Sequence, residues 1–137
     1  MLFRSELIND LLALMAAQAL DYTIFFRALS HSTGAARDLA LDIHAFDAWA
    51  SRYRTRLAEE NSNDTQRSER MKCVNPKFVL RNHLAQVAIE RAQHKDFSEI
   101  DRLLGILERP FDEQAENETY AAPPPDWAKH ISVSCSS

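Results

Sequence analysis

The stretch Arg70-Met-Lys-Cys-Val-Asn-Pro-Lys-Phe-Val-Leu-Arg-Asn-His-Leu-Ala-Gln86 carries the clearest helix signal of the chain. Asn75 can accept hydrogen bonds from the free N–H groups of a first helical turn. Pro76 suits the first helical position, because the N–H that proline lacks would have no partner there. The apolar residues that follow recur at helical spacing and would line one face: Leu80, Leu84, Val87 and Ala88. The sequence therefore predicts a helix that begins at Asn75.

Similar apolar spacing predicts further helices on both sides of this stretch. Residues 5–19, capped by Ser5, a shorter segment capped by Asp21, and residues 44–60 each place apolar side chains on one face. Asp96 starts another helix, with Glu99 in a capping-box arrangement, and Pro110 ends it. Gly105 inside it marks either a close backbone approach or a tolerated cost of about 1 kcal/mol. Residues 61–69 are polar throughout, and we expect a loop there.

Composition fits a protein of one helical domain. The chain has 137 residues, of which 45% are hydrophobic and 26% are charged, and only two are glycine. Its net charge of −4 gives no general attraction to nucleic acid or to an anionic membrane. No apolar run approaches the roughly 20 residues that span a bilayer. Two cysteines make a disulfide framework unexpected.

The C-terminal part differs in character, and Pro123-Pro-Pro125 favours an extended geometry. Residues 131–134 alternate apolar and polar side chains and could form a short edge strand. We predict an all-α fold, an irregular bundle of about five helices with an extended Pro-rich C-terminal tail. The expected segments are N-terminal helices over 1–61, a polar linker over 62–74, a helical pair over 75–111 and the tail over 112–137.

The tail also carries a family resemblance. Ala121-Ala-Pro-Pro-Pro-Asp-Trp-Ala-Lys129, followed by Ser134-Cys-Ser-Ser137, resembles the C-terminal end of the selenoprotein O (SelO) family of kinase-like protein adenylyltransferases. Weaker similarity extends through Asp21-Tyr-Thr-Ile-Phe-Phe-Arg27 and Trp49-Ala-Ser-Arg-Tyr-Arg54. The resemblance implies that the chain is the C-terminal part of a larger kinase-like protein that transfers AMP from ATP to hydroxyl groups of other proteins.

The same resemblance sets expectations for partners and cofactors. It implies ATP and Mg²⁺ as cofactors of the full-length protein, bound by an N-terminal kinase-like region that is this chain's partner in cis. Protein substrates are the other partners, and neither nucleic acid nor a membrane is expected. A bacterial cytoplasm is the implied location, or mitochondria for a eukaryotic member.

No catalytic machinery is visible in the 137 residues themselves. The sequence has no Gly-rich phosphate loop, no Asp-Phe-Gly motif and no His-Arg-Asp motif, so we assign no catalytic or cofactor-binding residue. His83 and His94 would lie about 16 Å apart along one helix, too far to share a metal ion. We expect the isolated chain to be inactive. The alternative is a free-standing helical protein-interaction module that lacks catalysis.

Cys135 is the residue that we single out for regulation. By position alone it is an exposed thiol whose thiolate is disfavoured by the nearby C-terminal carboxylate. The resemblance implies more, namely a redox role that includes a disulfide to the kinase-like region. A bridge between Cys73 and Cys135 within this chain is the remaining possibility.

Docking residues are expected on polar and aromatic side chains outside the apolar stripes. Arg81 and Asn82 could contact the catalytic region, and Tyr120 and Trp127 could dock the tail. The chain has one basic cluster, which is either a solvated face paired with Asp64 and Glu69 or a docking face: Arg67, Arg70, Lys72, Lys77 and Arg81. Large aromatic residues could leave an exposed apolar patch on the isolated chain: Phe25, Phe26, Phe46, Trp49 and Phe78.

Overall fold

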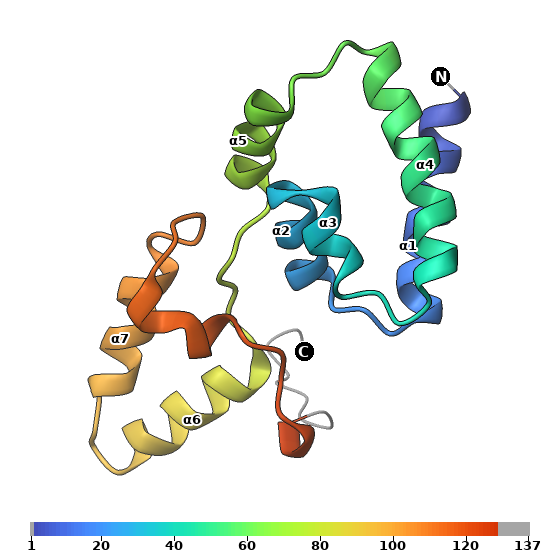
Figure 1. The fold of residues 1–137 in the computed structure, drawn as a ribbon. Coiled ribbons are helices and arrows are strands. Elements are labelled where there is room, and N and C mark those ends of the chain that lie inside the picture. Colours follow the sequence, from blue (N-terminus) through green and yellow to red (C-terminus); the bar gives the residue numbers. More distant parts are fainter. Residues whose placement is uncertain (1, 129–137) are drawn as a thin grey trace. The chain divides into compact units, whose positions relative to one another are not determined.

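The computed structural model describes residues 2–128, and it describes the side chains of residues 5–128 (Figure 1). The described part is helical and contains no strand, which confirms the all-α prediction. It has seven α-helices and two 3₁₀ helices, more than the five helices expected. They are α1 (Leu2–Ala17), α2 (Tyr22–His31), α3 (Thr33–Arg37), α4 (Ile43–Glu59), α5 (Asp64–Val74), α6 (Asn82–Gln93), α7 (Ser98–Leu107), η1 (Ala115–Ala121) and η2 (Asp126–Ala128).

The chain divides into two compact units, Met1–Asn75 and Pro76–Ser137. In the first unit α1 packs along α4, and α2 packs against both α3 and α5 (Figure 1). The second unit is built on the hairpin of α6 and α7. None of the described helices is both long and apolar enough to cross a membrane.

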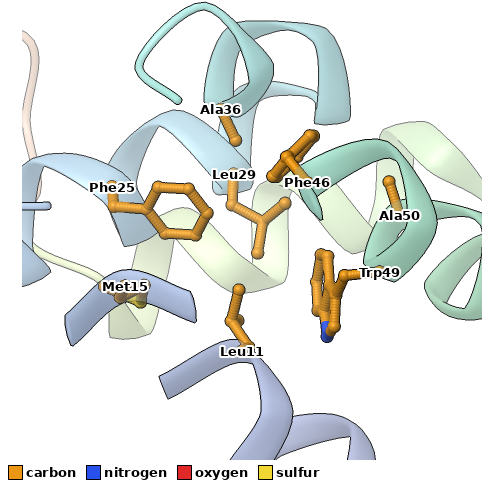
Figure 2. Close-up of a cluster of buried hydrophobic side chains, with 8 residues drawn as sticks. All are labelled: Leu11, Met15, Phe25, Leu29, Ala36, Phe46, Trp49 and Ala50. Atoms are coloured by element: carbon orange, nitrogen blue, oxygen red, sulfur yellow. The ribbon is translucent and has the colours of Figure 1, made fainter. Parts of the chain in front are cut away.

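The core of the first unit is a cluster of aromatic and aliphatic side chains drawn from α1 to α4 (Figure 2). The ring of Phe25 meets that of Phe46 edge-on at 6.1 Å, and Trp49 stacks on Tyr53 at 4.9 Å. The indole N–H of Trp49 donates to the carbonyl of Leu7 at 2.9 Å, which ties α4 to α1. The members of the cluster are Leu11, Met15, Phe25, Leu29, Ala36, Phe46, Trp49 and Ala50.

This packing corrects the expectation of an exposed aromatic patch. Phe25, Phe46 and Phe78 are at most 1% exposed and Trp49 is 5% exposed, while Phe26 is half-buried. Within the first unit the rings of Phe25, Phe46 and Trp49 pack against one another, and each buried ring contributes about 1.5–3 kcal/mol of burial free energy. Four of these five aromatic side chains are therefore interior and the fifth is half-buried, so these five residues leave no exposed patch of their own.

The expected loop over 61–69 is largely wrong, because α5 begins at Asp64. The side chain of Asn63 accepts a hydrogen bond from the N–H of Gln66 at 3.0 Å and caps the helix. Asp64 then lies in the first turn, where a negative charge is favourable. No residue of α5 is fully buried, which explains why its sequence is polar enough to resemble a loop.

Asn75 ends α5 and does not begin the next helix, so the expected N-cap is wrong. Its N–H donates to the carbonyl of Met71 at 2.8 Å, and its side-chain amide donates to the Ser30 hydroxyl at 3.0 Å. Arg27, buried on α2, donates to the carbonyls of Lys72 and Asn75, each at 3.1 Å. The guanidinium of Arg27, which binds the C-terminal carbonyls of α5, and the side-chain amide of Asn75 therefore hold α5 against α2.

The first helix also begins earlier than expected, at Leu2, so Ser5 lies inside it and is not its cap. Asp21 and the segment 44–60 behave as predicted: Asp21 accepts from the N–H of Ile24 at 3.0 Å, and α4 spans Ile43–Glu59. The starts of α2 and α4 depend on local capping and apolar spacing, and both signals can be read from neighbouring residues in the sequence.

In the second unit, α6 begins at Asn82, six residues later than Pro76. The N–H groups of Lys77 and Phe78 instead donate to the carbonyl of Pro110, which holds this segment beside the end of α7. Leu80, expected on the buried stripe, is 57% exposed. Proline at a favourable first position did not start a helix, because the following backbone N–H groups bind a distant carbonyl.

The end of α7 is closed by a buried glutamine. The Gln114 side-chain amide donates to the carbonyls of Ile106 at 3.1 Å and Arg109 at 2.9 Å, and its oxygen accepts from Asn117 at 3.0 Å. Residues 115–121 and 126–128 are 3₁₀ helical, so the tail is not extended over those residues.

Two further expectations concern Gly105 and the end of the tail. A Cβ atom added at Gly105 would meet nothing within 4 Å beyond its own stretch of helix, which supports the tolerated glycine and not a close backbone approach. The expected strand over 131–134 lies outside the described residues.

Candidate regulatory and docking residues

The expected redox residue, Cys135, lies outside the described residues, so its redox role remains a prediction. Cys73 is described: it is an exposed free cysteine on α5. A bridge between the two is likewise untested. Residue Ala128, buried in η2, is the described point from which the chain leads to Cys135.

The four expected docking residues form two groups at opposite ends of α6. Arg81 and Asn82 begin this helix, and the ring of His83 meets that of Trp127 edge-on at 6.3 Å. Trp127 is therefore beside the first turn of α6, and it is 60% exposed. Tyr120 lies instead near Arg91, nine residues or roughly 14 Å further along the helix axis. The structure thus places Arg81, Asn82 and Trp127 at the start of α6 and Tyr120 near its other end.

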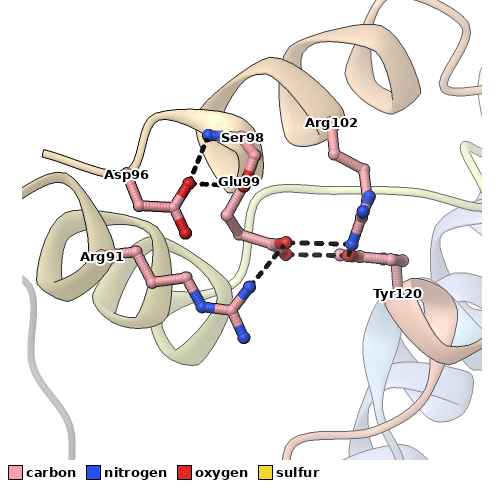
Figure 3. A network of polar contacts seen from close by, with 6 residues as sticks. All are labelled: Arg91, Asp96, Ser98, Glu99, Arg102 and Tyr120. Atoms are coloured by element: carbon pink, nitrogen blue, oxygen red, sulfur yellow. Dashed lines mark hydrogen bonds and ion pairs between the residues drawn. The ribbon is translucent and has the colours of Figure 1, made fainter.

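Tyr120 belongs to a network around the buried carboxylate of Glu99 (Figure 3). The Tyr120 hydroxyl donates to Oε2 at 2.8 Å, and the guanidiniums of Arg91 and Arg102 lie 3.4 and 3.2 Å from Oε1. Arg102 also donates to the Tyr120 oxygen at 3.3 Å, and this bond together with the charge of Glu99 raises the pKa of Arg102. Two cations and a hydroxyl offset the desolvation of the carboxylate.

The network replaces the capping box expected at Asp96 and Glu99. The carboxylate of Asp96 accepts from the backbone N–H of Ser98 at 3.0 Å and from its hydroxyl at 2.6 Å. Both bonds hold the pKa of Asp96 below its usual range. The N–H of Asp96 donates to the carbonyl of Arg91, so Glu99 does not reach back to it. Sequence spacing indicates the Glu99–Arg102 pair at i, i+3, but no local signal identifies Tyr120 as its partner.

Two cations of the expected basic cluster, Arg67 and Lys77, form ion pairs with acidic neighbours. Arg67 pairs with Asp64 at 2.7 Å. Lys77, whose side chain is 13% exposed, pairs with Glu113 at 3.2 Å and with Glu118. Burial alone lowers the pKa of Lys77, but the hydrogen bonds and charges of Glu118 and Glu113 outweigh it and raise that pKa. For these two cations the solvated, paired alternative fits better than a basic docking face.

His83 lies in the first turn of α6, with its ring beside Trp127. Burial and the positive charge of Arg81 lower the pKa of His83. Within residues 2–128 no three His, Cys, Asp or Glu side chains lie together in a way that could hold a metal ion.

Comparison of the sequence with those of known proteins identifies a family that matches this chain. The sequence model of the family described as "Protein adenylyltransferase SelO" matches residues 2–108. A protein named "Protein nucleotidyltransferase YdiU" from Burkholderia lata is 55% identical over 140 aligned positions, which cover 97% of this chain and 27% of that protein. The protein of the same name from Herminiimonas arsenicoxydans is 55% identical over 139 positions, covering 96% and 28%. The chain thus spans about a quarter of the length of these relatives.

Proposed function

Because this chain belongs to the SelO family of protein adenylyltransferases, we propose that it is the C-terminal helical, regulatory part of an enzyme that transfers AMP to protein hydroxyls. The observation that carries the proposal is the combination of high identity with partial coverage. Relatives named as nucleotidyltransferases share 55% identity with nearly all of this chain, yet the chain equals only 27% of the length of one of them. The proposal places the protein in the bacterial cytoplasm.

The proposed reaction joins a protein Ser, Thr or Tyr hydroxyl to the α-phosphorus of ATP. The hydroxyl loses its proton, a phosphodiester forms to AMP, and pyrophosphate leaves. ATP and Mg²⁺ would be held by the part of the enzyme outside these 137 residues, where Mg²⁺ would offset phosphate charge. The present chain contributes a helical scaffold to that part.

The regulatory part of the proposal concerns Cys135 and the way its tail is anchored. Tyr120 is fixed to Glu99, and Gln114 is fixed to the end of α7, so the chain is held in place up to Ala128. Cys135 lies seven positions after Ala128 in the sequence, so seven Cα–Cα steps join the two residues. Even fully stretched, they place the thiol within about 25 Å of Ala128. The partner cysteine of the proposed disulfide must lie inside that radius in the assembled enzyme.

A chimera tests the assignment directly. In the Burkholderia lata relative, the matching quarter is replaced by this chain, and transfer of labelled AMP from ATP to protein is measured. We expect the chimera to transfer AMP and the relative truncated before that quarter to be impaired or inactive. Equal transfer by the truncated relative would contradict the proposed role, and would favour the free-standing interaction module.

The redox role has its own test in the same chimera. Oxidised glutathione would accept the two electrons released when Cys135 and a second thiol form a disulfide and lose their protons. We expect oxidation to lower AMP transfer and dithiothreitol to restore it, with Cys135→Ser abolishing this response. Cys73→Ser is the matched control, since Cys73 is an exposed thiol of the same chain. A response that follows Cys73 instead would contradict the assignment to Cys135.

A further inference from the structure

The second half of α1 has an unusual surface for a solvent-facing helix. From Leu11 to Leu20 the chain has no charged residue, and Gln18 is its only polar side chain. Gln18 does not face solvent, because it is buried and its oxygen accepts from the N–H groups of Leu41 at 2.8 Å and Asp42 at 3.0 Å. Every side chain that α1 exposes between Leu11 and Ala17 is therefore apolar.

We use the name α1 outer face for the exposed apolar residues of α1 from Ile8 onward together with Leu41: Ile8, Leu12, Ala13, Ala16, Ala17 and Leu41. Ile8, Leu12 and Ala16 follow at four-residue spacing along one side of the helix. Leu41, between α3 and α4, is 80% exposed and lies across a pocket of about 430 Å³ from Ala17. Leu14, Gln18, Asp42 and Ala45 also line this pocket, and the carboxylate of Asp42 accepts a hydrogen bond from the N–H of Ala45 at 3.0 Å.

The other side of α1 is already used by the core. Leu11 and Met15 are buried, and the carbonyl of Leu7 binds Trp49 of α4. Helices that are apolar on both sides are typical of positions with packing partners on both sides. The exposed surfaces of two other helices of the first unit carry charges: α4 exposes Arg52 and Arg54, and α5 exposes Glu69 and Arg70. Other large apolar side chains of the first unit are exposed too, Tyr22, Ile43 and Val74, but each stands at the end of its helix, whereas the exposed apolar residues of α1 follow one another along the helix.

We propose that the α1 outer face docks against an apolar surface on the part of the full-length protein that lies outside these 137 residues. This inference rests on the proposed function. The family match begins at residue 2 and includes all of α1, while the relatives are nearly four times as long as the segment that they share with this chain. A face left bare when one part of a protein is considered alone is expected to be apolar and continuous.

Co-purification tests the inference without relying on catalysis. The tagged 137-residue chain is co-expressed with the Burkholderia lata relative from which the matching quarter has been removed, and the amount of captured relative is measured. Two variants place a carboxylate on the α1 outer face, Leu12→Glu and Leu41→Glu. Leu41 is so exposed that its replacement should leave the fold of the chain intact, which circular dichroism and thermal melting verify.

The matched control is Thr65→Glu, which adds the same charge to the same unit at an exposed position in the first turn of α5, where a carboxylate is favourable. We expect Leu12→Glu and Leu41→Glu to reduce capture roughly tenfold or more, because a carboxylate buried without a partner is strongly disfavoured. Thr65→Glu should capture as much as the wild-type chain.

The remaining outcomes overturn the inference in distinguishable ways. Equal capture by wild type and both α1-face variants would refute docking through this face but leave the proposed function standing. No capture by the wild-type chain would refute both. Light scattering that shows a wild-type dimer and a Leu41→Glu monomer, with capture unchanged, would assign the α1 outer face to a second copy of the chain instead.

Discussion

The Tyr120 hydroxyl donates a hydrogen bond of 2.8 Å to the buried carboxylate of Glu99, and so joins the start of the tail to the first turn of α7. Twenty-one residues separate the two in sequence. The bond helps to hold the 3₁₀ segment η1 in place, although η1 has no buried residue of its own. The Tyr120 hydroxyl provides the buried Glu99 carboxylate with a hydrogen-bond donor.

Removal of this hydroxyl should destabilise the second unit. Tyr120→Phe keeps the ring and deletes the donor to Glu99, so we expect the free energy of unfolding to fall by about 1.5–3 kcal/mol, the usual range for hydrogen bonds to charged groups. Urea denaturation at pH 7 measures the change. Tyr22→Phe, at a tyrosine that is 63% exposed, is the control and should change it by less than about 0.5 kcal/mol. Equal effects of the two replacements would contradict the Glu99 anchor.

Arg27 should matter as much to the first unit. Arg27→Leu removes the donor to the carbonyls of Lys72 and Asn75 and leaves both without that partner. We expect a loss of about 2–3 kcal/mol, with increased amide hydrogen exchange concentrated in α5. Arg70→Leu, at an exposed arginine of α5, is the comparison and should have little effect. Unchanged protection of α5 in Arg27→Leu would show that other contacts hold this helix.

The depressed pKa of His83 gives a pH dependence with a definite sign. Burial and Arg81 disfavour the charged imidazole in the folded state, so the unfolded state binds a proton more readily. The stability linked to His83 is therefore complete above the ordinary pKa of about 6.5 and is lost as pH falls through the folded-state pKa. Between pH 7.5 and pH 5, wild type should lose more stability than His83→Gln. Two-dimensional NMR should place the His83 titration below pH 6.5, and a titration above it would contradict this account.

The pairs of Lys77 predict a salt-dependent contribution. Glu118→Gln removes one carboxylate from Lys77, and we expect a loss of about 0.5–1 kcal/mol that shrinks at high salt, as for other partly exposed ion pairs. Because the pKa of Lys77 is raised, its contribution is complete at neutral pH and is lost only as pH rises through that raised value. Glu116→Gln is the control on the same 3₁₀ segment. A loss from Glu118→Gln that does not depend on salt would point to packing instead.

The sequence predicts those helices whose signals are local. The cap at Asp21 and the apolar spacing of α4 needed only neighbouring residues, and both were confirmed. The helix start predicted at Asn75–Pro76 is wrong, because asparagine can also end a helix, as Asn75 does for α5. What decided its role were bonds to Ser30 and Arg27, both more than forty residues away.

The candidate site follows the same division between local and distant partners. The sequence indicates Arg81, Asn82 and Trp127 as polar or aromatic residues outside the apolar stripes, and the structure places them at the start of α6. The sequence predicts that Tyr120 docks the tail, and in the structure its hydroxyl donates a hydrogen bond to Glu99. The α1 outer face was missed, because apolar residues on every side of a helix give no spacing signal for an unpaired face.

We propose that this chain completes an adenylylating enzyme whose reactive groups lie outside these 137 residues. The most direct measurement adds the purified chain in increasing amounts to the purified remainder of the Burkholderia lata relative and follows labelled AMP transfer to protein. The account predicts no transfer by the chain alone and a saturable rise when the two parts are mixed. Transfer by the chain alone, or a remainder whose activity ignores the added chain, would contradict it.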